Sequence, residues 1–584
     1  MKLSRLWISR FFLSLFVVSL GCNSEDDWEA RQGDPDLEAI ARKLEARAES
    51  LSIQETVSSL AYLQGLQPIR VVGYGIVVGL GEKGSSECPP DIRSRLVQEM
   101  RKRHHLGLES RGLRELHPNE LLEDLDTAVV RVSADIPGGA LRRTVMDAAV
   151  TALTGTQTRS LRGGYLWRCD LKRFRADGAA TVVQGKTLAA AEGPVFISAF
   201  DDEGELLADV NPRVGSLLGG ARVNVDREIR LEIREPSFQT ATLVARKINE
   251  RFPESKKVAD ATSPGMVKLS IPQRYRGRES EFLALLMHVS LRESSGFVEE
   301  RTRDLCEEIF DPDAPHDDIG LAWEAIGKGT LPEVRKLYGD RRAYVNYHAA
   351  RTGLRMNDVD AVLVMRRHAY DLQSPFQQEA IQELGRAEKL TDAAAVLRPL
   401  LNHDDDRLRI QAYLALRRRM DRFIRPIRVG EPNFVIDRVR STGAPLIYAR
   451  TTGAQRLAIF GDQALCRPPL FYEHPDRIFG LHARPNADKI TVLRIGPDGS
   501  MLSAPIEAPL EVGGLAEKMG SELGTRRNED WAGANLPYSE VIKALFDLSR
   551  SGDINAEFEV ETTKDRVGRG PLEPPGRPES DLED

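Results

Sequence analysis

The stretch that decides the fold runs Ile69-Arg-Val-Val-Gly-Tyr-Gly-Ile-Val-Val-Gly-Leu80. Its glycines, Gly73, Gly75 and Gly79, have the outline of a dinucleotide-binding loop. In such a loop the second glycine opens a helix whose N-terminus faces the pyrophosphate. Here the β-branched residues 76–78 follow instead and predict more strand. We therefore interpret the glycines as sites of close backbone approach and turns in a packed hairpin.

Short β-like runs continue along the chain and alternate with helical runs. Predicted strands include residues 127–133, 180–183, 195–199 and 267–271, and predicted helices include residues 92–102 and 241–251. This alternation predicts a mixed α/β region over residues 56–300.

Residues 301–430 lose the strand pattern, and Ala, Leu and Arg recur there at helical spacing. Segments around Ala349, Ala380 and Ala412 can be overlaid, with these alanines 31 and 32 residues apart. Such a period predicts HEAT-like helical pairs, although HEAT repeats usually span ~40 residues. Asp404 to Asp406 predict the N-terminal cap of the last helix.

Strand patterns return over residues 431–562. An all-helical block between two stretches of similar texture is typical of a domain inserted into a surface loop. The predicted fold class is therefore α+β: mixed α/β core domains with an inserted all-α HEAT-like repeat domain.

The ends of the chain have their own patterns. Residues 1–21 have the order of a secretory signal peptide, because basic residues precede an apolar run that ends at a small residue. Cys22 follows directly, which resembles the lipobox of bacterial lipoproteins and predicts lipid attachment there; ordinary cleavage near Gly21 is the alternative. Residues 22–55 read as an acidic N-terminal linker, and residues 563–584, rich in Pro, Gly and charge, are predicted to be disordered.

Composition excludes several function classes. The 584 residues hold 81 Lys and Arg against 88 Asp and Glu, so the net charge of -7 provides no broad basic field for nucleic acid. Five cysteines, none in a CxxC pair, and scattered histidines predict no metal site. The motifs of serine hydrolases, zinc proteases and phosphate-binding loops are absent from the sequence, so we expect no catalytic residues and no cofactor.

An arginine cluster closes the helical block. An anionic polymer or lipid head groups could bind it, but such a run more often solvates a helix end and favours the C-terminal dipole. Its members are Arg417, Arg418, Arg419, Arg422, Arg425 and Arg428.

Several further segments follow residues 69–80 in a fixed order. They are Ala128-Val-Val-Arg-Val-Ser-Ala-Asp-Ile-Pro137, Ser160-Leu-Arg-Gly-Gly-Tyr-Leu166, Gly220-Ala-Arg-Val-Asn-Val-Asp-Arg-Glu228, Tyr448-Ala-Arg-Thr-Thr-Gly453 and Leu457-Ala-Ile-Phe-Gly-Asp462. In this order the segments resemble the bacterial flagellar basal-body P-ring proteins, with the helical block as an addition. The motif positions that carry the resemblance are Gly73, Tyr74, Gly75, Gly79, Gly163, Gly164, Gly220, Arg227, Glu228, Gly453 and Gly461.

The resemblance implies a structural part and no enzyme. P-ring proteins are exported to the periplasm, where many copies close into a ring around the flagellar rod at the peptidoglycan layer and act as a bushing. The implied partners are further copies of the chain, the rod, the outer-membrane ring protein and a periplasmic ring chaperone. A closed ring needs heterologous side surfaces on each subunit.

Two other functions stay open at this stage. The chain could be a lipid-anchored cell-envelope scaffold whose helical repeats bind a protein partner, unrelated to motility. It could also be an envelope enzyme, if folding assembles a polar site from distant residues.

Overall fold

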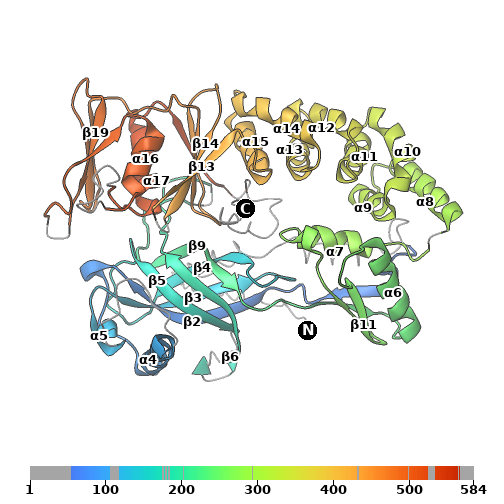
Figure 1. The fold of residues 1–584 in the computed structure, drawn as a ribbon, viewed down its shortest axis with the longest axis horizontal. Helices are drawn as coiled ribbons and strands as arrows, with labels where there is room; N and C mark the ends of the chain where they lie inside the picture. The colour runs from blue at the N-terminus through green and yellow to red at the C-terminus, as the bar shows by residue number, and fades with distance from the viewer. Residues whose placement is uncertain are drawn as a thin grey trace, which may run out of the picture.

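The computed structural model describes residues 54–105, 118–173, 176–177, 180–181, 185–201, 203–292, 294–430, 433–496, 499–523, 533–562 and 565. The predicted signal peptide, Cys22, nearly all of the acidic linker and nearly all of the C-terminal tail lie outside these residues. Figure 1 shows two rows: a β-barrel and a small α/β unit below, and a two-sheet C-terminal unit and a row of helices above. The chain contains both helices and strands, which confirms the α+β class.

The N-terminal half of the chain forms a closed six-stranded barrel in the order β2-β3-β4-β9-β8-β5. The strands are β2 (Ile69–Val78), β3 (Ala128–Ile136), β4 (Val145–Ala152), β5 (Tyr165–Arg173), β8 (Thr187–Pro194) and β9 (Val214–Val223); the short β6 (Ala176–Asp177) and β7 (Ala180–Thr181) pair with each other. The outer face of β2 packs under α4 (Pro90–His105) and α5 (Pro118–Glu123). Burial on both faces explains why its sequence is a nearly continuous apolar run.

The deciding stretch differs from its prediction in one respect. β2 runs unbroken through Gly73 and Gly75, so these glycines provide close approach without a hairpin turn, and the chain turns at Gly79 with φ of +79°. Residues 195–199, predicted as a strand, form only an isolated bridge from Phe196 to Ser216. Here Phe196 leaves the barrel and packs into the core of the C-terminal unit.

The small α/β unit holds a four-stranded sheet in the order β1-β10-β12-β11. Its elements are α3 (Val57–Leu60), β1 (Ala61–Gln64), β10 (Ile229–Ile233), α6 (Phe238–Arg251), β11 (Ala259–Ser263), β12 (Met266–Leu269) and α7 (Glu279–Met287). The side chain of Ser237 accepts a hydrogen bond from the Gln239 backbone N–H and so caps α6. The small unit is built from two separate segments of the chain. α3 and β1 come before the barrel strands in sequence, and β10, α6, β11, β12 and α7 come after them.

The row of helices follows. It consists of α8 (Ser295–Glu308), α9 (His316–Ile326), α10 (Leu331–Val334), α11 (Ala343–Arg355), α12 (Asp360–Tyr370), α13 (Gln377–Arg386), α14 (Thr391–Leu397) and α15 (Asp406–Arg418). Ala349, Ala380 and Ala412 are fully buried on α11, α13 and α15. Asp405 accepts a hydrogen bond from the Arg407 N–H at the start of α15, within the predicted cap. The last helix of the row ends at Arg418, whereas the sequence predicts that the helical block extends to residue 430.

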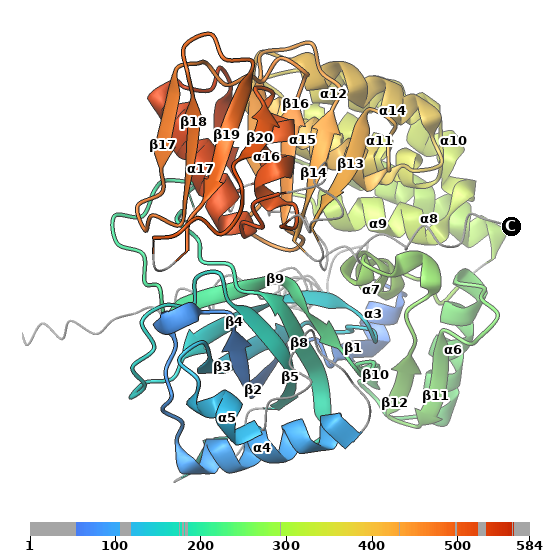
Figure 2. The same ribbon diagram turned by 60° about the vertical axis from the view of Figure 1, so that its left-hand side comes forward.

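The C-terminal unit has two sheets with helices packed against them (Figure 2). One sheet has the order β13-β14-β16-β15-β21, and the other is β17-β18-β19-β20. Their strands are β13 (Ile424–Val429), β14 (Phe434–Val439), β15 (Leu446–Ala449), β16 (Arg456–Phe460), β17 (Leu470–Glu473), β18 (Phe479–Ala483), β19 (Lys489–Arg494), β20 (Ile506–Pro509) and β21 (Glu557–Val560). The helices α16 (Val512–Gly520) and α17 (Tyr538–Ser551) share one apolar core with both sheets.

Candidate functional site

The motif glycines of the barrel lie where neighbouring strands come very close. A Cβ atom added at Gly73 would lie 2.5 Å from the carbonyl oxygen of Asp170, a backbone atom that has little freedom to move. For Gly75, Gly164 and Gly220 the nearest atoms would be 3.0, 2.4 and 2.7 Å away. The barrel wall therefore requires small residues at these positions.

Two adjacent motif residues of opposite charge lie where the chain passes from the barrel to the small unit: Arg227 contacts the barrel, and Glu228 contacts β10 and β12. Arg227 donates from Nη1 to the Ile136 carbonyl at 2.8 Å and from Nη2 to the Gln67 carbonyl at 2.6 Å. Burial, together with Arg173, lowers the pKa of Arg227 to about 10. The neighbouring Glu228 is exposed, and its hydrogen bonds with Arg230 and Lys268 lower its pKa to about 2. Arg227 thus fixes the path by which the chain enters and leaves the barrel.

The remaining motif residues lie at turns and on the outer wall. Tyr74 packs against the cluster beneath α4. Gly163, Gly453 and Gly461 have positive φ angles of 78°, 67° and 76°. Gly163 and Gly453 lie at the contact between the barrel and the C-terminal unit, which we call the barrel seam.

Aromatic side chains form the apolar part of the barrel seam. Phe196 and Phe200, which follow β8, pack into the core of the C-terminal unit. The ring centroid of Phe196 lies 5.9 Å from that of Tyr538, and the Phe200 centroid lies 5.0 Å from that of Phe546. The segment after β8 therefore contributes to the hydrophobic core of the C-terminal unit, while the barrel interior has a core of its own.

A buried carboxyl forms the centre of the polar part. Asp147 on β4 accepts hydrogen bonds from the backbone N–H of Gly219 on β9 and of Gly453 in the β15–β16 turn, the latter at 3.0 Å. Burial raises the pKa of Asp147 from its ordinary 3.8 to about 6, although both hydrogen bonds act in the opposite direction. One side chain thus ties two strands of the barrel to a turn 306 residues away in sequence.

A second polar contact lies beside Gly163. Arg162 forms ion pairs with Asp476 at 3.1 Å and with Glu540 at 3.5 Å. Glu540 on α17 also contacts His474 at 2.6 Å, and both of these side chains are almost fully buried. The loop before β5 is therefore held by charges from two elements of the C-terminal unit.

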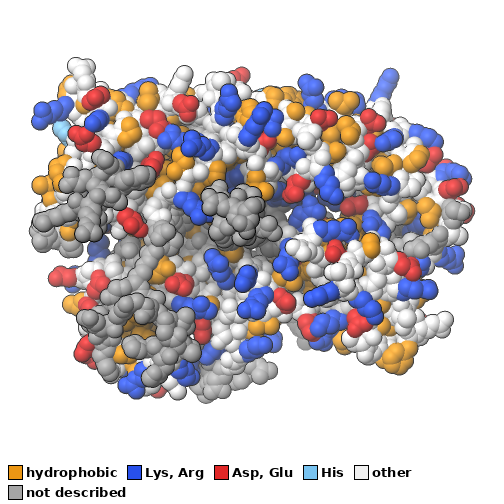
Figure 3. Space-filling model, in the orientation of Figure 1, with side chains coloured by type: hydrophobic (Ala, Val, Ile, Leu, Met, Phe, Trp, Pro, Cys, Tyr) orange, Lys and Arg blue, Asp and Glu red, His pale blue; other side chains and the backbone are white. Residues whose placement is uncertain are grey.

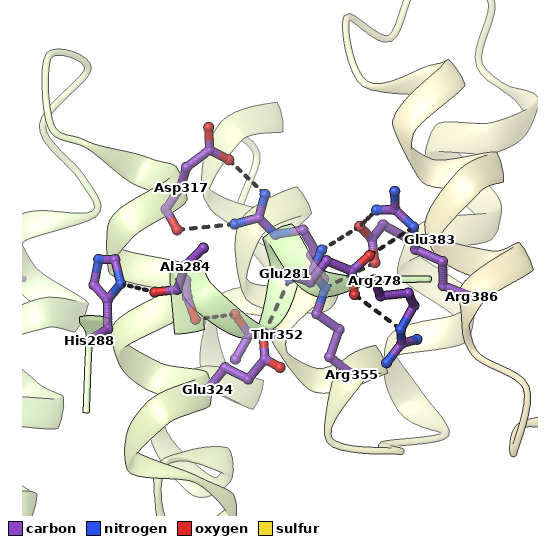
Figure 4. Close-up of polar contacts among 12 residues, drawn as sticks. Arg278, Glu281, Ala284, His288, Asp317, Glu324, Thr352, Arg355, Glu383 and Arg386 are labelled. Carbon is purple, nitrogen blue, oxygen red and sulfur yellow. Dashed lines mark hydrogen bonds and ion pairs between the residues drawn. The ribbon is translucent and has the colours of Figure 1, made fainter. Parts of the chain in front are cut away.

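The helical row meets the small unit at a second contact, the helical seam, shown in Figure 4. Arg386 of α13 lies 3.2 Å from Glu281 of α7 and 2.8 Å from Glu383. Arg355 of α11 pairs with Glu383 at 2.7 Å and with Glu324 of α9 at 3.4 Å. These charges link four helices from two units.

The electrostatics of the helical seam favour the charged form of Glu383. Burial alone would raise the pKa of Glu383, but Arg355 and Arg386 outweigh it and hold that pKa well below its ordinary 4.5. At the other end of the seam, His288 contacts the Ala284 carbonyl at 2.8 Å, and burial lowers its pKa. Arg351 pairs with Asp317 at 2.6 Å.

Metal sites, membrane-spanning helices and cysteines are the other features that could indicate a functional site. Among the described residues no group of three or more His, Cys, Asp or Glu side chains could hold a metal ion, and no helix is long and apolar enough to cross a membrane. Cys88, Cys169, Cys306 and Cys466 are not joined to one another by disulfides. On the face shown in Figure 3, acidic, basic and apolar side chains are interspersed, with several basic groups near the middle.

Sequence reasoning missed the seam residues themselves. Asp147 lies within the apolar run of β4, and a lone carboxyl in such a run is the one local sign of its role. Arg162 adjoins the quoted Gly163-Gly164 pair, which could have drawn attention to it. Nothing near His474 or Glu540 in sequence indicates that the two side chains meet.

Comparisons with a family model and with individual proteins find similarity to the same kind of protein. A family model described as Flagellar P-ring protein matches residues 56–302. A Flagellar P-ring protein of Geobacter metallireducens is 30% identical over 252 residues, which are 41% of this chain and 63% of that protein. One from Thermotoga maritima is 28% identical over 311 residues, 51% of this chain and 84% of that protein.

These matches confirm the resemblance to P-ring proteins that the sequence motifs predict. The chain covers 63% of the length of the Geobacter relative. The family match ends at residue 302, close to the start of the helical row at Ser295. The resemblance quoted for residues 448–462 lies outside the matched range and stays a prediction.

Proposed function

We propose that this chain is a structural subunit of the flagellar basal-body P-ring. Many copies assemble into a periplasmic ring around the rod at the peptidoglycan layer, and the ring serves as a bushing. The role is mechanical, so no residue acts as a catalyst and no cofactor is needed. The match of residues 56–302 to P-ring proteins supports this proposal.

The single observation that carries the proposal furthest is the barrel seam. Residues of the matched region, among them Asp147 and Arg162, bind Gly453, Asp476 and Glu540 of the C-terminal unit. A subunit that bears load between neighbours must transmit force across its own parts, and a packed aromatic contact with buried polar ties does so better than a flexible linker.

The other partners follow from the same role. They are the rod, the outer-membrane ring protein and a periplasmic ring chaperone. A lipid on Cys22 would add a membrane tether to the periplasmic location. We further propose that the helical row is a HEAT-like domain inserted into the P-ring core, so that the helices between Ser295 and Arg418 extend the ring surface.

Electron microscopy of basal bodies from the host tests the function. Basal bodies from cells that lack this gene should have no ring at the peptidoglycan level, and the cells should not swim. Restoring the full chain should restore both. A complete ring in the deletion strain would overturn the proposal.

One observation favours a second candidate, a lipid-anchored envelope scaffold that binds a protein through its helices. Exposed apolar side chains gather on α12 and just beyond its ends: Val359, Leu363, Tyr370 and Leu372 are 53%, 62%, 41% and 60% exposed. Such a stripe is typical of a protein-binding surface. An intact ring in the deletion strain, together with loss of an α12-dependent crosslink in the envelope, would favour this reading.

A further inference from the structure

The five-stranded sheet of the C-terminal unit ends in two strands of opposite charge. β13 forms one edge and β21 the other. On β13 the side chains of Arg425 and Arg428 are exposed, and on β21 those of Glu557 and Glu559 are exposed. Unpaired edges of a sheet are places where another chain can add.

The basic edge contains half of the arginine cluster that the sequence singles out. Arg419 is used within the fold, since its guanidinium donates to the Leu384 carbonyl at 3.1 Å and to the Leu390 carbonyl at 2.8 Å. Arg422, Arg425 and Arg428, in contrast, are exposed, and none of them forms an ion pair with a residue that the structure describes. These three residues are called the basic edge below; Arg425 and Arg428 are three positions apart on β13 and so project from opposite faces of the sheet.

The arrangement around the basic edge leaves its charge uncompensated. Arg425 lies directly opposite Arg438 in the β13–β14 ladder, and like charges in that position repel. Arg438 is itself bound to Glu511 through two hydrogen bonds. The basic edge therefore favours an anionic partner from outside this chain.

The opposite edge of the sheet, β21, has exposed acidic side chains. Glu557 and Glu559 pair with Leu446 and Tyr448 and so point to the same face of the sheet. A contact with Asp406 raises the pKa of Glu557, and burial followed by the charges of Asp406 and Glu557 raises the pKa of Glu559. We call Glu557 and Glu559 the acidic edge; neither is in an ion pair with a described residue.

The two edges cannot neutralise each other within one chain. Neighbouring strands lie about 4.8 Å apart, so the four steps from β13 to β21 separate the edges by about 19 Å. Pro426, in the middle of β13, has no N–H to donate. Proline and charged residues at an edge oppose a continuous sheet between molecules, and they leave side-chain ion pairs as the mode of contact.

We propose that the basic edge of one copy docks against the acidic edge of the next copy, so that these edges form a head-to-tail contact of the ring. The inference rests on the proposed function and names the surfaces through which neighbours meet. A contact between two different surfaces repeats from copy to copy and closes when the rotation allows it. Each copy then gains ion pairs for edge side chains that form none with a described residue of their own chain.

Charge reversal in the full chain tests the contact. Arg425→Glu with Arg428→Glu makes both edges acidic, and Glu557→Arg with Glu559→Arg makes both edges basic. Each variant alone should lose assembly by about tenfold or more, because like charges then face each other. An equal mixture of the two variants should assemble again in alternation, as measured by light scattering and electron microscopy.

The matched control is Arg366→Glu with Arg367→Glu, an equal charge reversal on the exposed face of α12, which should assemble like the wild type. Circular dichroism and thermal unfolding of every variant report whether it folds. Normal assembly of both edge variants, or a mixture that fails to recover, would overturn the contact while the ring itself stands. Loss with the arginine variant alone would show a different anionic partner and also overturn it. A wild-type chain that never assembles would overturn the ring and this contact together.

Discussion

Asp147 is a buried carboxyl whose ionisation has a cost in the folded protein. Its pKa is about 6 in the native state against an ordinary 3.8, so the native state holds the proton more tightly than the unfolded chain does. Between these two pH values the free energy of unfolding therefore falls as pH rises. Well above pH 6, ionisation of Asp147 lowers the free energy of unfolding by its full amount, about 3 kcal/mol.

Replacing this carboxyl by an amide should remove the pH dependence. In Asp147→Asn the side-chain oxygen can still accept from Gly219 and Gly453, but no charge forms at any pH. Relative to the wild type, the variant should gain about 2 kcal/mol between pH 4 and pH 7, because part of the cost is already present at pH 4. Urea unfolding at the two pH values measures this difference, with the exposed Asp209→Asn as control. Identical pH slopes in variant and wild type would contradict the account.

The same residue shows what the sequence can and cannot predict at this scale. The interpretation of Gly73 as a close approach is correct, because a glycine among β-branched residues of a strand commonly marks a place where another backbone comes near. The function of Asp147 depends on Gly453, far away in the chain, and no local pattern encodes that meeting. Residues defined by their own backbone were predictable, and residues defined by a distant partner were not.

At the scale of helices, the helical seam depends on Glu383. Its carboxylate forms ion pairs with Arg355 and Arg386, and removing its charge leaves two partly buried guanidinium groups less compensated. Glu383→Gln should lower the free energy of unfolding by about 3 kcal/mol near neutral pH. Because the pKa of Glu383 is depressed in the native state, its contribution is present above about pH 4.5 and is lost as pH falls.

Thermal unfolding over a pH series measures this effect. The control is Glu379→Gln, the same substitution one turn earlier on α13 at an exposed position, which should unfold like the wild type. A deficit of Glu383→Gln that stays constant down to pH 3 would argue against the charge as its cause.

Helices and strands with regular sequence patterns were predicted correctly more often than those with irregular patterns. Ala349, Ala380 and Ala412 recur at one period, and all three are buried on long helices of the row. The end of the row was placed too late, because the exposed arginines of β13 hide an edge strand behind a helix-like composition. The short segment after β8 was predicted as a strand, although its aromatic residues serve a contact with another unit.

For the whole molecule, Arg162 provides a test of whether the barrel and the C-terminal unit behave as one body. Its guanidinium lies between Asp476 and the buried Glu540, so a carboxylate at this position would face two like charges. The cost should be about 2 kcal/mol, since Asp476 is half exposed and partly screened. The contacts of Phe196 and Phe200 with the C-terminal unit should hold the units together while their relative orientation becomes looser.

Arg162→Glu should therefore raise the radius of gyration in small-angle X-ray scattering and speed cleavage of the chain after β8 by a protease. Arg159→Glu, an identical charge change at an exposed position three residues earlier, should leave both measurements unchanged. High salt should reduce the difference between the two variants, because screening weakens repulsion between charges. Equal scattering curves for the two variants would mean that the charged contacts beside Gly163 do not help to fix the barrel against the C-terminal unit.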